Sequence, residues 1–400
     1  MIDKEKKTVV IGLSGGVDSS VAAYLLKEQG YDVRALFMIN WKDNTVTLSG
    51  DCSWEEDLIV AKLVAKELGI PLEVVDSSER YRQSVVDYMF SEYEKGRTPN
   101  PDVLCNREIK FDIFREAAEK IGADYIATGH YAAIDEIAVS DKVYSRLMAA
   151  EDKNKDQSYF LCQLSQAQLK NVLFPLGKID KPEVRRIAAE INLASAQKKD
   201  SQGICFIGKV DLPTFLQQKL KPKQGKVIEI DAESEDLKKQ VEEMTQNTDL
   251  KKQCSPFDFS NIRGKIAGEH KGAHYYTIGQ RKGLNIGGKP KPLFVLATDI
   301  EKNIIYVGQG HDHPGLNRKG LFIRKDEIHW IRPDLELSEN QQNECWCRIR
   351  YRQPLQKATI IMQNEGLYIV FDELQRGITP GQFAAWYYDN EIVGSGIINA

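Results

Sequence analysis

In the first third of the chain, short apolar segments alternate with longer amphipathic segments. The apolar segments have the length of buried strands, whereas the amphipathic segments repeat their apolar residues every three to four positions, as helices do. Strands that alternate with such helices predict a mainly parallel, doubly wound α/β sheet, in which ligands bind beyond the carboxyl ends of the strands. We predict strands at residues 8–13, 33–39, 72–75 and 125–128, and helices at residues 17–27, 54–68, 80–95 and 107–121.

The final hundred residues carry shorter apolar segments, which are rich in β-branched and aromatic residues and are separated by turn signals such as Thr379-Pro380-Gly381. This pattern predicts an all-β module, and we expect a small barrel. Residues 345–351 form one of its predicted strands, and strand geometry places Cys345 and Cys347 on the same face, as buried thiols.

The sequence between these regions is mixed and rich in Gly and Lys. A charged stretch at residues 232–252 keeps Leu237, Val241 and Met244 at helical spacing. It predicts a solvent-facing helix, and we expect a poorly ordered continuation to about residue 264. We therefore expect three domains: an α/β domain at residues 1–210, a small mixed central domain at residues 211–292, and a C-terminal β-barrel at residues 293–400.

The composition is that of an ordinary folded protein: 400 residues, of which 42% are hydrophobic and 28% charged, with a net charge of −4. No apolar stretch reaches the roughly 18–20 residues that a membrane span requires, and the charged start of the chain is unlike a secretory signal. The seven cysteines include no C-x-x-C pair, which argues against a disulfide framework and against iron–sulfur or zinc-ribbon sites. We expect a cytoplasmic protein that makes no membrane contact and lacks a strongly basic coat for nucleic acid, although a local basic face is compatible with this charge.

A glycine-rich segment, Ser14-Gly15-Gly16-Val17-Asp18-Ser19-Ser20, follows the first predicted strand and begins the first predicted helix. Glycines allow backbone N–H groups to approach an anion, and the start of a helix adds partial positive charge. The Lys of a Walker loop is absent, which argues against cleavage of a γ-phosphate. The alternative interpretation is a simple turn in which Asp18 or Ser19 caps the helix.

Two segments that contain a cysteine are candidates for chemistry. In residues 98–106, prolines predict an extended loop, Asp102 precedes Cys105 by three residues, and Cys105 lies at the edge of a helix whose N-terminal end favours a thiolate. In residues 198–207, two lysines precede Cys205 and would favour its thiolate if they fold toward it. Read alone, the polar residues of the first segment are also compatible with turn and cap roles, and Cys205 with an inert buried thiol.

Taken together, these segments resemble the tRNA-specific 2-thiouridylases. Residues 12–20 resemble the pyrophosphate loop of the ATP pyrophosphatase superfamily, whose members cleave ATP between the α and β phosphates and adenylate a carbonyl oxygen. The resemblance runs from this loop to the last strand and implies an adenine nucleotide alpha hydrolase-like first domain, and the charged segment at about 232–263 departs from the usual pattern. The other motifs that carry the resemblance lie at residues 100–106, 127–131, 155–161, 203–206, 274–283, 350–352 and 379–382.

The resemblance implies 2-thiolation of the wobble uridine, position 34 of certain tRNAs, with ATP and Mg²⁺. Adenylation would turn the C2 oxygen into a better leaving group, and the products would be 2-thiouridine, AMP and pyrophosphate. Sulfur would arrive from a sulfur-relay carrier protein or a cysteine desulfurase as a persulfide. By the resemblance, Cys205 carries that persulfide, Cys105 attacks it or forms a transient disulfide, and Asp102 acts as general acid or base beside the flipped base. We expect a monomer.

The resemblance also implies binding residues. The ATP contacts would be Gly12, Leu13, Ser14, Gly15, Gly16, Val17, Asp18, Ser19, Met38 and Gly129, with Asp18 also a candidate ligand of Mg²⁺. The target base would meet Asn100, Pro101 and Asp102, and the rest of the tRNA would meet His130, Lys155, Asp156, Gln157, Arg350, Tyr351 and Gln382. Alternatives stay open: Met38 as a core residue, His130 as a cap of its strand, and the Arg350 segment as an exposed barrel face.

Two pairs of histidines, His270-x-x-x-His274 and His311-x-His313, have the spacing of metal ligands. Neither pair has nearby cysteine or carboxylate partners in an obvious cluster, so we expect no transition metal bound by the protein. Two other functions are compatible with parts of the sequence. An adenylating amidotransferase would use the same phosphate loop without needing Cys205, and a non-catalytic tRNA-binding protein would use the β-module without cleaving ATP.

Overall fold

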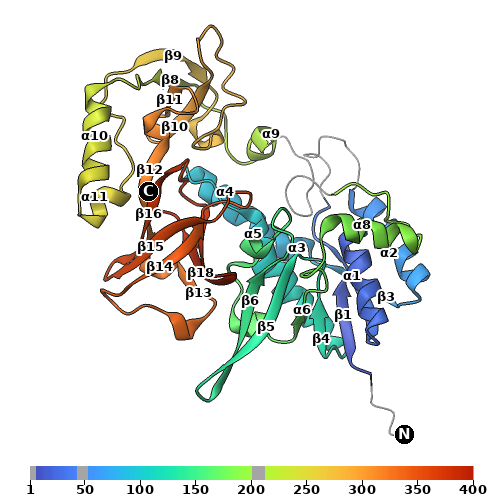
Figure 1. Ribbon diagram of the computed structural model, residues 1–400. Helices are drawn as coiled ribbons and strands as arrows, with labels where there is room; N and C mark the ends of the chain where they lie inside the picture. Colours follow the sequence, from blue (N-terminus) through green and yellow to red (C-terminus); the bar gives the residue numbers. More distant parts are fainter. Residues whose placement is uncertain (1–5, 43–52, 201–211, 400) are drawn as a thin grey trace.

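The N-terminal region folds around a parallel sheet, as the alternating pattern predicts (Figure 1). The computed structural model describes residues 6–42, 53–200 and 212–399. Among these residues the sheet has five strands in the order β3-β2-β1-β4-β7, and every neighbouring pair is parallel. The strands are β1 (Thr8–Gly12), β2 (Asp32–Ile39), β3 (Leu72–Asp76), β4 (Tyr125–Ala127) and β7 (Val172–Leu173).

Helices cover both faces of this sheet. They are α1 (Val17–Glu28), α2 (Ser53–Leu68), α3 (Ser78–Tyr81), η1 (Arg82–Val86), α4 (Asp87–Glu94), α5 (Pro101–Cys105), η2 (Asn106–Ile113), α6 (Phe114–Lys120) and α8 (Lys181–Glu190). Val9 and Ile11 of β1 pack with α1, α2 and α8, whereas Val10 packs on the other face with α4, α5 and η2, because successive residues of a strand point to opposite faces. The doubly wound fold is therefore confirmed, and its strand order reverses at β1 and β4, where a ligand crevice is expected.

Residues 98–106 differ from the prediction of an extended loop. Helix α5 begins at Pro101, and it continues through η2 into α6 without a break. Proline at the first helical position lacks only an N–H that would have no partner there, and the Asn100 side chain accepts a hydrogen bond from Val103 N at 3.3 Å. Cys105 is consequently the last residue of α5 rather than the edge residue of a helix that follows a loop.

The middle of the chain forms a separate small sheet in the order β10-β11-β8-β9. The expected boundary at residue 293 does not match this pairing, because β10 and β11 were expected in the C-terminal barrel and instead join β8 and β9. Pairing between distant segments decided this boundary, and strand patterns alone do not reveal which strands pair. The elements are α9 (Leu212–Leu216), β8 (Gly225–Glu229), β9 (Lys265–His270), β10 (Leu293–Asp299) and β11 (Ile304–Gln309).

The charged insertion is ordered and packed on the molecule. Its helix α10 (Glu235–Gln246) buries Leu237 and Met244 and is followed by the short helix α11 (Leu250–Cys254). The expectation of a poorly ordered continuation is wrong, because Phe257, Phe259 and Ile262 are buried in the same apolar cluster. One face of α10 is solvated, as predicted, but its apolar stripe is not.

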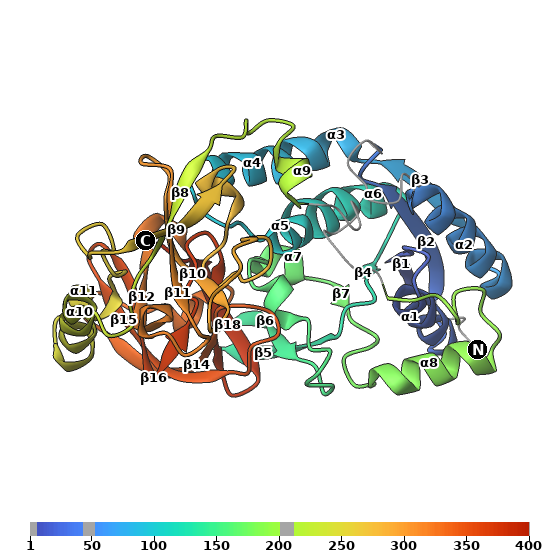
Figure 2. The same cartoon turned by 90° about the horizontal axis from the view of Figure 1, so that it is seen from above.

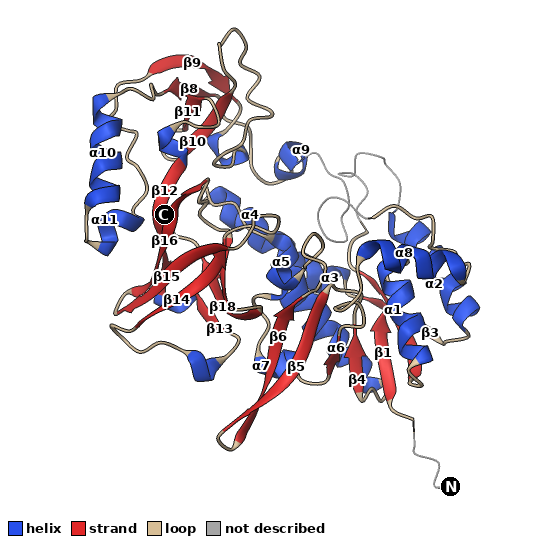
Figure 3. Ribbon diagram, viewed as in Figure 1, coloured by secondary structure: helices blue, strands red, loops and turns tan. Residues whose placement is uncertain are grey.

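Figure 3 shows that strands dominate the C-terminal region, whereas helices gather around the N-terminal sheet. Among the described residues, the C-terminal sheet has nine strands: the path β12-β16-β15-β14-β17-β18-β6-β5, with β13 paired to β18. They are β5 (Ala132–Val139), β6 (Lys142–Ala149), β12 (Asn317–Arg324), β13 (Ile328–Trp330), β14 (Gln342–Arg348), β15 (Gln356–Gln363), β16 (Gly366–Arg376), β17 (Phe383–Tyr388) and β18 (Glu391–Ile397). Cys345 and Cys347 of β14 are buried, as predicted.

The β5–β6 hairpin joins the two ends of the molecule. It follows the N-terminal sheet in the chain, yet β6 pairs with β18, so that Leu147 faces Ile392. Viewed from above, the hairpin lies between the C-terminal strands and the helices of the first domain (Figure 2).

No helix among the described residues is long and apolar enough to cross a membrane.

Candidate active site

The phosphate loop is shaped by contacts among its own residues. Gly15 has φ +75°, and a Cβ atom there would lie 2.3 Å from the carbonyl oxygen of Asp57, so this position accepts only glycine. The Ser19 hydroxyl accepts a hydrogen bond from Ser14 N at 3.2 Å and donates to the Gly16 carbonyl at 3.1 Å. The loop therefore holds a tight turn directly before the first turn of α1, as an anion site requires.

The loop after β4 closes the other side of the crevice. A Cβ atom on Gly129 would lie 2.7 Å from Ser19 N, so glycine allows this backbone to reach the start of α1. The strand-order reversal thus brings together the residues expected to bind ATP that follow β1 and β4. Met38, on β2, is 9% exposed and belongs to the apolar core, which agrees with its alternative interpretation as a packing residue.

Asp18 faces a cluster of side chains that the sequence did not single out. Its Oδ1 accepts hydrogen bonds from the Tyr131 hydroxyl at 2.8 Å and from Lys181 Nζ at 2.7 Å. Asp18 therefore does not cap α1, whose N-cap residue is Gly16. Burial and the nearby Asp18 charge raise the pKa of Tyr131. The sequence feature that could have pointed to Lys181 is its position directly after Asp180, the N-cap residue of α8.

Lys181 also contacts a second carboxylate. Its Nζ lies 2.7 Å from Asp200, which further pairs with Arg185 at 2.7 Å and with Lys155 at 2.6 Å. Burial alone would raise the pKa of Asp200, but the hydrogen bonds from Lys155 and Lys181 outweigh burial and lower it. Lys155, expected at the tRNA, is thus tied to the cluster beside the phosphate loop.

Asn100, Pro101 and Asp102 lie at the start of α5, with Cys105 one turn later. Cys105 is fully buried in the core that also holds Met38 and Val10, so its sulfur lies in an apolar setting on one face of the parallel sheet. Its expected partner Cys205 lies outside the described residues. Of the two lysines expected near Cys205, Lys198 forms an ion pair with Asp57.

Two residues expected to contact tRNA are buried. Asp156 is 3% exposed, accepts hydrogen bonds from the backbone N–H groups of Ala150 and Ser158, and pairs with Arg348 at 3.1 Å. The His130 ring lies between aromatic rings and is hydrogen-bonded to the Thr128 hydroxyl at 2.8 Å. Burial lowers the pKa of His130 well below its usual value. These contacts favour structural roles for both side chains and argue against direct contact with tRNA in this conformation.

The remaining expected tRNA residues lie where the first and last domains meet. Gln157 Oε1 accepts a hydrogen bond from Tyr131 N at 3.0 Å. The Tyr351 ring packs in a tilted arrangement against Phe160, with a centroid distance of 4.3 Å. Arg350 donates to the Arg376 carbonyl at 2.5 Å, and it lies in the turn after β14, not on the strand that the sequence predicted.

Gln382 lies in the same contact zone. Its side chain is hydrogen-bonded to the segment that precedes α5, with Nε2 at 2.9 Å from the Thr98 carbonyl oxygen. The structure therefore brings Gln382 next to Asn100, although 282 positions separate the two residues in the chain.

Residues 6–42, 53–200 and 212–399 contain no group of three or more His, Cys, Asp or Glu side chains that could hold a metal ion. Magnesium with ATP is bound largely by phosphate oxygens, so one protein carboxylate is sufficient. Asp18 is such a carboxylate, at the loop itself, and the residues present fit a magnesium–nucleotide complex. His313 is instead hydrogen-bonded to the Ile230 carbonyl and Gly315 N, at 3.2 Å each.

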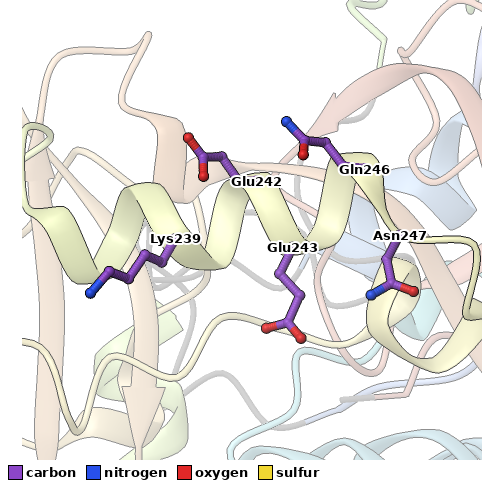
Figure 4. A pocket seen from close by; sticks show the side chains of 5 residues that line it. All are labelled: Lys239, Glu242, Glu243, Gln246 and Asn247. Atoms are coloured by element: carbon purple, nitrogen blue, oxygen red, sulfur yellow. The ribbon is translucent and has the colours of Figure 1, made fainter.

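A shallow depression also lies along α10, lined by Lys239, Glu242, Glu243, Gln246 and Asn247 (Figure 4). These are polar side chains at the end of one solvated helix, and Glu243 pairs with Lys252 at 2.5 Å. The depression lies at the opposite end of the molecule from the phosphate loop (Figure 1) and has none of that loop's features.

Comparison with known proteins agrees with this geometry. Residues 7–209 match the family described as tRNA methyl transferase HUP domain, residues 250–309 the tRNA methyl transferase PRC-barrel domain, and residues 321–398 the aminomethyltransferase beta-barrel domain. The tRNA-specific 2-thiouridylase MnmA of Flavobacterium johnsoniae is 58% identical over 395 residues, which cover 98% of this chain and all of that protein. The chain belongs to the tRNA-specific 2-thiouridylase family. The 2-thiouridylase of Christiangramia forsetii is 56% identical, with 98% of this chain and all of that protein covered.

This 2-thiouridylase family member is a tRNA-uridine 2-sulfurtransferase, a transferase, as expected. The matched families agree with the predicted order of an α/β domain, a small central domain and a C-terminal β-barrel, and they describe the central domain as a PRC-barrel. Solved structures are more distant. A 4-thiouridine synthetase–RNA complex with bound ATP is 18% identical over 53% of this chain and 50% of its own, with a TM-score of 0.31. The NMN synthetase of Francisella tularensis is 15% identical over 54% and 74%, with a TM-score of 0.32.

Proposed function

We propose that this protein uses ATP to thiolate C2 of the wobble uridine, position 34 of its substrate tRNAs. The observation that carries the proposal is the glycine-only contact between the loop after β4 and the first turn of α1, at the reversal of strand order. This contact leaves backbone N–H groups beside the start of a helix, an arrangement suited to pyrophosphate. Membership of a 2-thiouridylase family supports 2-thiolation of a tRNA uridine as the reaction that this nucleotide site serves.

In this proposal residues 12–19, together with Met38 and Gly129, bind ATP. Lys181 holds Asp18 and brings positive charge to the phosphates, and Mg²⁺ would be held by phosphate oxygens and Asp18. Asn100, Pro101 and Asp102 receive the flipped uridine, and Asp102 moves a proton at the base. Attack of the C2 oxygen on the α-phosphate releases pyrophosphate, so that oxygen can then leave as AMP.

The sulfur step needs two thiols. The outer sulfur of a Cys205 persulfide attacks C2, and AMP departs with the former C2 oxygen. The Cys105 thiolate then attacks the Cys205 sulfur, which breaks the sulfur–sulfur bond and leaves the transferred sulfur on C2 as 2-thiouridine. The Cys105–Cys205 disulfide is afterwards reduced by an external thiol. We propose that a sulfur-relay carrier or a cysteine desulfurase supplies the persulfide, and that the enzyme acts as a monomer in the cytoplasm.

We further propose that tRNA contacts the zone between the first and last domains. Lys155, Gln157, Arg350 and Tyr351 belong to this zone, and aromatic and basic side chains there suit stacking on bases and contact with phosphates. Salt should therefore weaken tRNA binding.

The decisive assay combines the purified full chain with ATP, Mg²⁺, a persulfide source and tRNA. The expected products are 2-thiouridine, AMP and pyrophosphate, and their formation should depend on every component. Absence of both 2-thiouridine and AMP would contradict the proposal. Formation of AMP with a thiolated product that does not require Cys205 would favour an adenylating enzyme of another specificity, and tRNA binding without ATP cleavage would favour a binding protein.

A further inference from the structure

The segment just before α5 is held by residues from all three parts of the chain. Thr98 N donates a hydrogen bond to the Pro380 carbonyl at 2.8 Å. The Thr98 hydroxyl lies 3.0 Å from that of Thr277, a residue of the central region. Arg97 pairs with Glu92 of its own domain and, at 3.6 Å, with Glu327 of the C-terminal region. This segment is thus fixed mostly by distant parts of the chain.

The side chain of Gln382 makes the densest set of these contacts. Its Nε2 donates to the carbonyl oxygens of Thr98 at 2.9 Å and Pro99 at 3.1 Å, and its Oε1 accepts from Asn100 Nδ2 at 3.4 Å. One amide therefore satisfies three consecutive residues. Both protons of the amide nitrogen and one lone pair of the oxygen are used within the protein.

These contacts lead directly to the start of α5. Asn100 is the N-cap residue, with Oδ1 bonded to Val103 N at 3.3 Å, while its Nδ2 faces Gln382. Asp102 follows in the first helical turn. Because a helix moves as a rigid element, the position of its N-cap sets the position of Asp102 and of Cys105.

We propose that Gln382 is a positioning residue that makes the geometry of the base-binding helix α5 depend on the docked C-terminal barrel. Its amide clamps residues 98–100 from outside their domain, and the Thr277 hydroxyl supports the clamp from the central domain. The amide's hydrogen-bonding capacity is directed at the protein, so Gln382 acts on tRNA thiolation through α5. Helix α5 is therefore correctly positioned when the C-terminal barrel is docked, and it loses that position when the barrel undocks.

The expected change in kcat for thiolation rests on the proposed function, whereas the expected change in amide hydrogen exchange does not. The variant Gln382→Leu keeps the bulk of the side chain and removes all three hydrogen bonds. Gln341→Leu is the matched control, because the Gln341 Oε1 accepts a hydrogen bond from Ser338 N at 2.8 Å within a turn of its own domain. Thr277→Val tests the central-domain support.

Amide hydrogen exchange and kinetics should be measured on the full chain of each variant. In Gln382→Leu we expect faster exchange of residues 97–105, a fall in kcat for tRNA thiolation of about 10- to 100-fold, and Kd values for tRNA and for ATP within twofold of the parent. Thr277→Val should show the same pattern more weakly, and Gln341→Leu should leave exchange at 97–105 and kcat unchanged.

Loss of tRNA affinity with kcat and exchange unchanged would overturn the inference, because Gln382 would then be a tRNA contact. Unchanged exchange together with unchanged kinetics would overturn it as well. If the parent protein forms no 2-thiouridine, the proposed function fails, and exchange at residues 97–105 still decides whether the clamp exists.

Discussion

The phosphate loop, residues 14–20, and the segment before α5, residues 97–100, belong to one domain, but they are held in different ways. Residues 14–20 are held by bonds among themselves, such as Ser14 N to the Ser19 hydroxyl at 3.2 Å. Residues 97–100 are held by Thr277, Pro380 and Gln382, which lie far away in the sequence. The turn of the phosphate loop is thus held largely by neighbouring residues, whereas the segment before α5 is held by residues that lie in other domains.

The largest effect is expected at the two cysteines that are proposed to transfer sulfur, which should affect thiolation but not ATP binding. Cys105→Ser and Cys205→Ser should each reduce thiolation by more than about 1,000-fold, because the hydroxyl can neither carry nor attack a persulfide, while ATP binding stays within twofold. Mass spectrometry of digested tRNA measures the product, and ATP titration measures binding. Cys345→Ala, at a buried thiol of β14, is the control and should retain thiolation. Normal turnover in either serine variant would show that its cysteine lacks the proposed role.

A second change attacks the phosphate loop alone. Gly15→Ala forces a Cβ atom against the Asp57 carbonyl at a backbone angle that costs alanine about 1–2 kcal/mol, so the turn should open and ATP affinity should fall about 100-fold. Calorimetric titration with ATP checks this. Gly30→Ala has a similar positive φ with no heavy atom within 4 Å, so it should lose about 1–2 kcal/mol of stability but keep its ATP affinity. Equal ATP affinity in the Gly15 variant would contradict the assigned turn.

A smaller effect is expected at Lys181, which is distant from the phosphate loop in the sequence but pairs with Asp18 of that loop. Lys181→Met removes the cation that bridges Asp18 and Asp200, and the KM for ATP should rise about tenfold, equivalent to about 1.4 kcal/mol. Lys178→Met, at an exposed lysine three residues earlier, should leave the KM unchanged. A parental KM in the Lys181 variant would limit that residue to a structural role.

The smallest effect concerns His130, which is buried in the segment that follows β4. Burial holds its pKa well below the usual value near 6.5, so below pH 6.5 the unfolded chain binds a proton that the folded chain does not. Stability therefore falls as the pH drops, at up to about 1.4 kcal/mol per pH unit for this group. Between pH 7 and pH 5.5, His130→Asn should lose about 1 kcal/mol less stability than the parent in urea unfolding.

A pH dependence of His130→Asn identical to the parent's would show that His130 gains its proton equally in both states. Burial would then not hold His130 neutral in the folded chain.

The parallel α/β domain, the phosphate loop and the buried pair Cys345 and Cys347 could be predicted from the amino-acid sequence. Each depends on a repeat or a motif within one short stretch: alternating strands and helices, glycines before a helix, or every second residue of a strand. Such patterns act through the backbone of neighbouring residues, so the order of residues is enough to predict them.

Other features depend on contacts that the tertiary fold creates. That fold moved β10 and β11 into the central sheet, buried Asp156 against Arg348, brought Lys181 to Asp18 and Gln382 to Thr98. Each of these contacts joins residues that lie many positions apart. Their partners are chosen by which domains pack together and which polar atoms that packing buries, because a buried polar group must find a partner wherever the fold provides one.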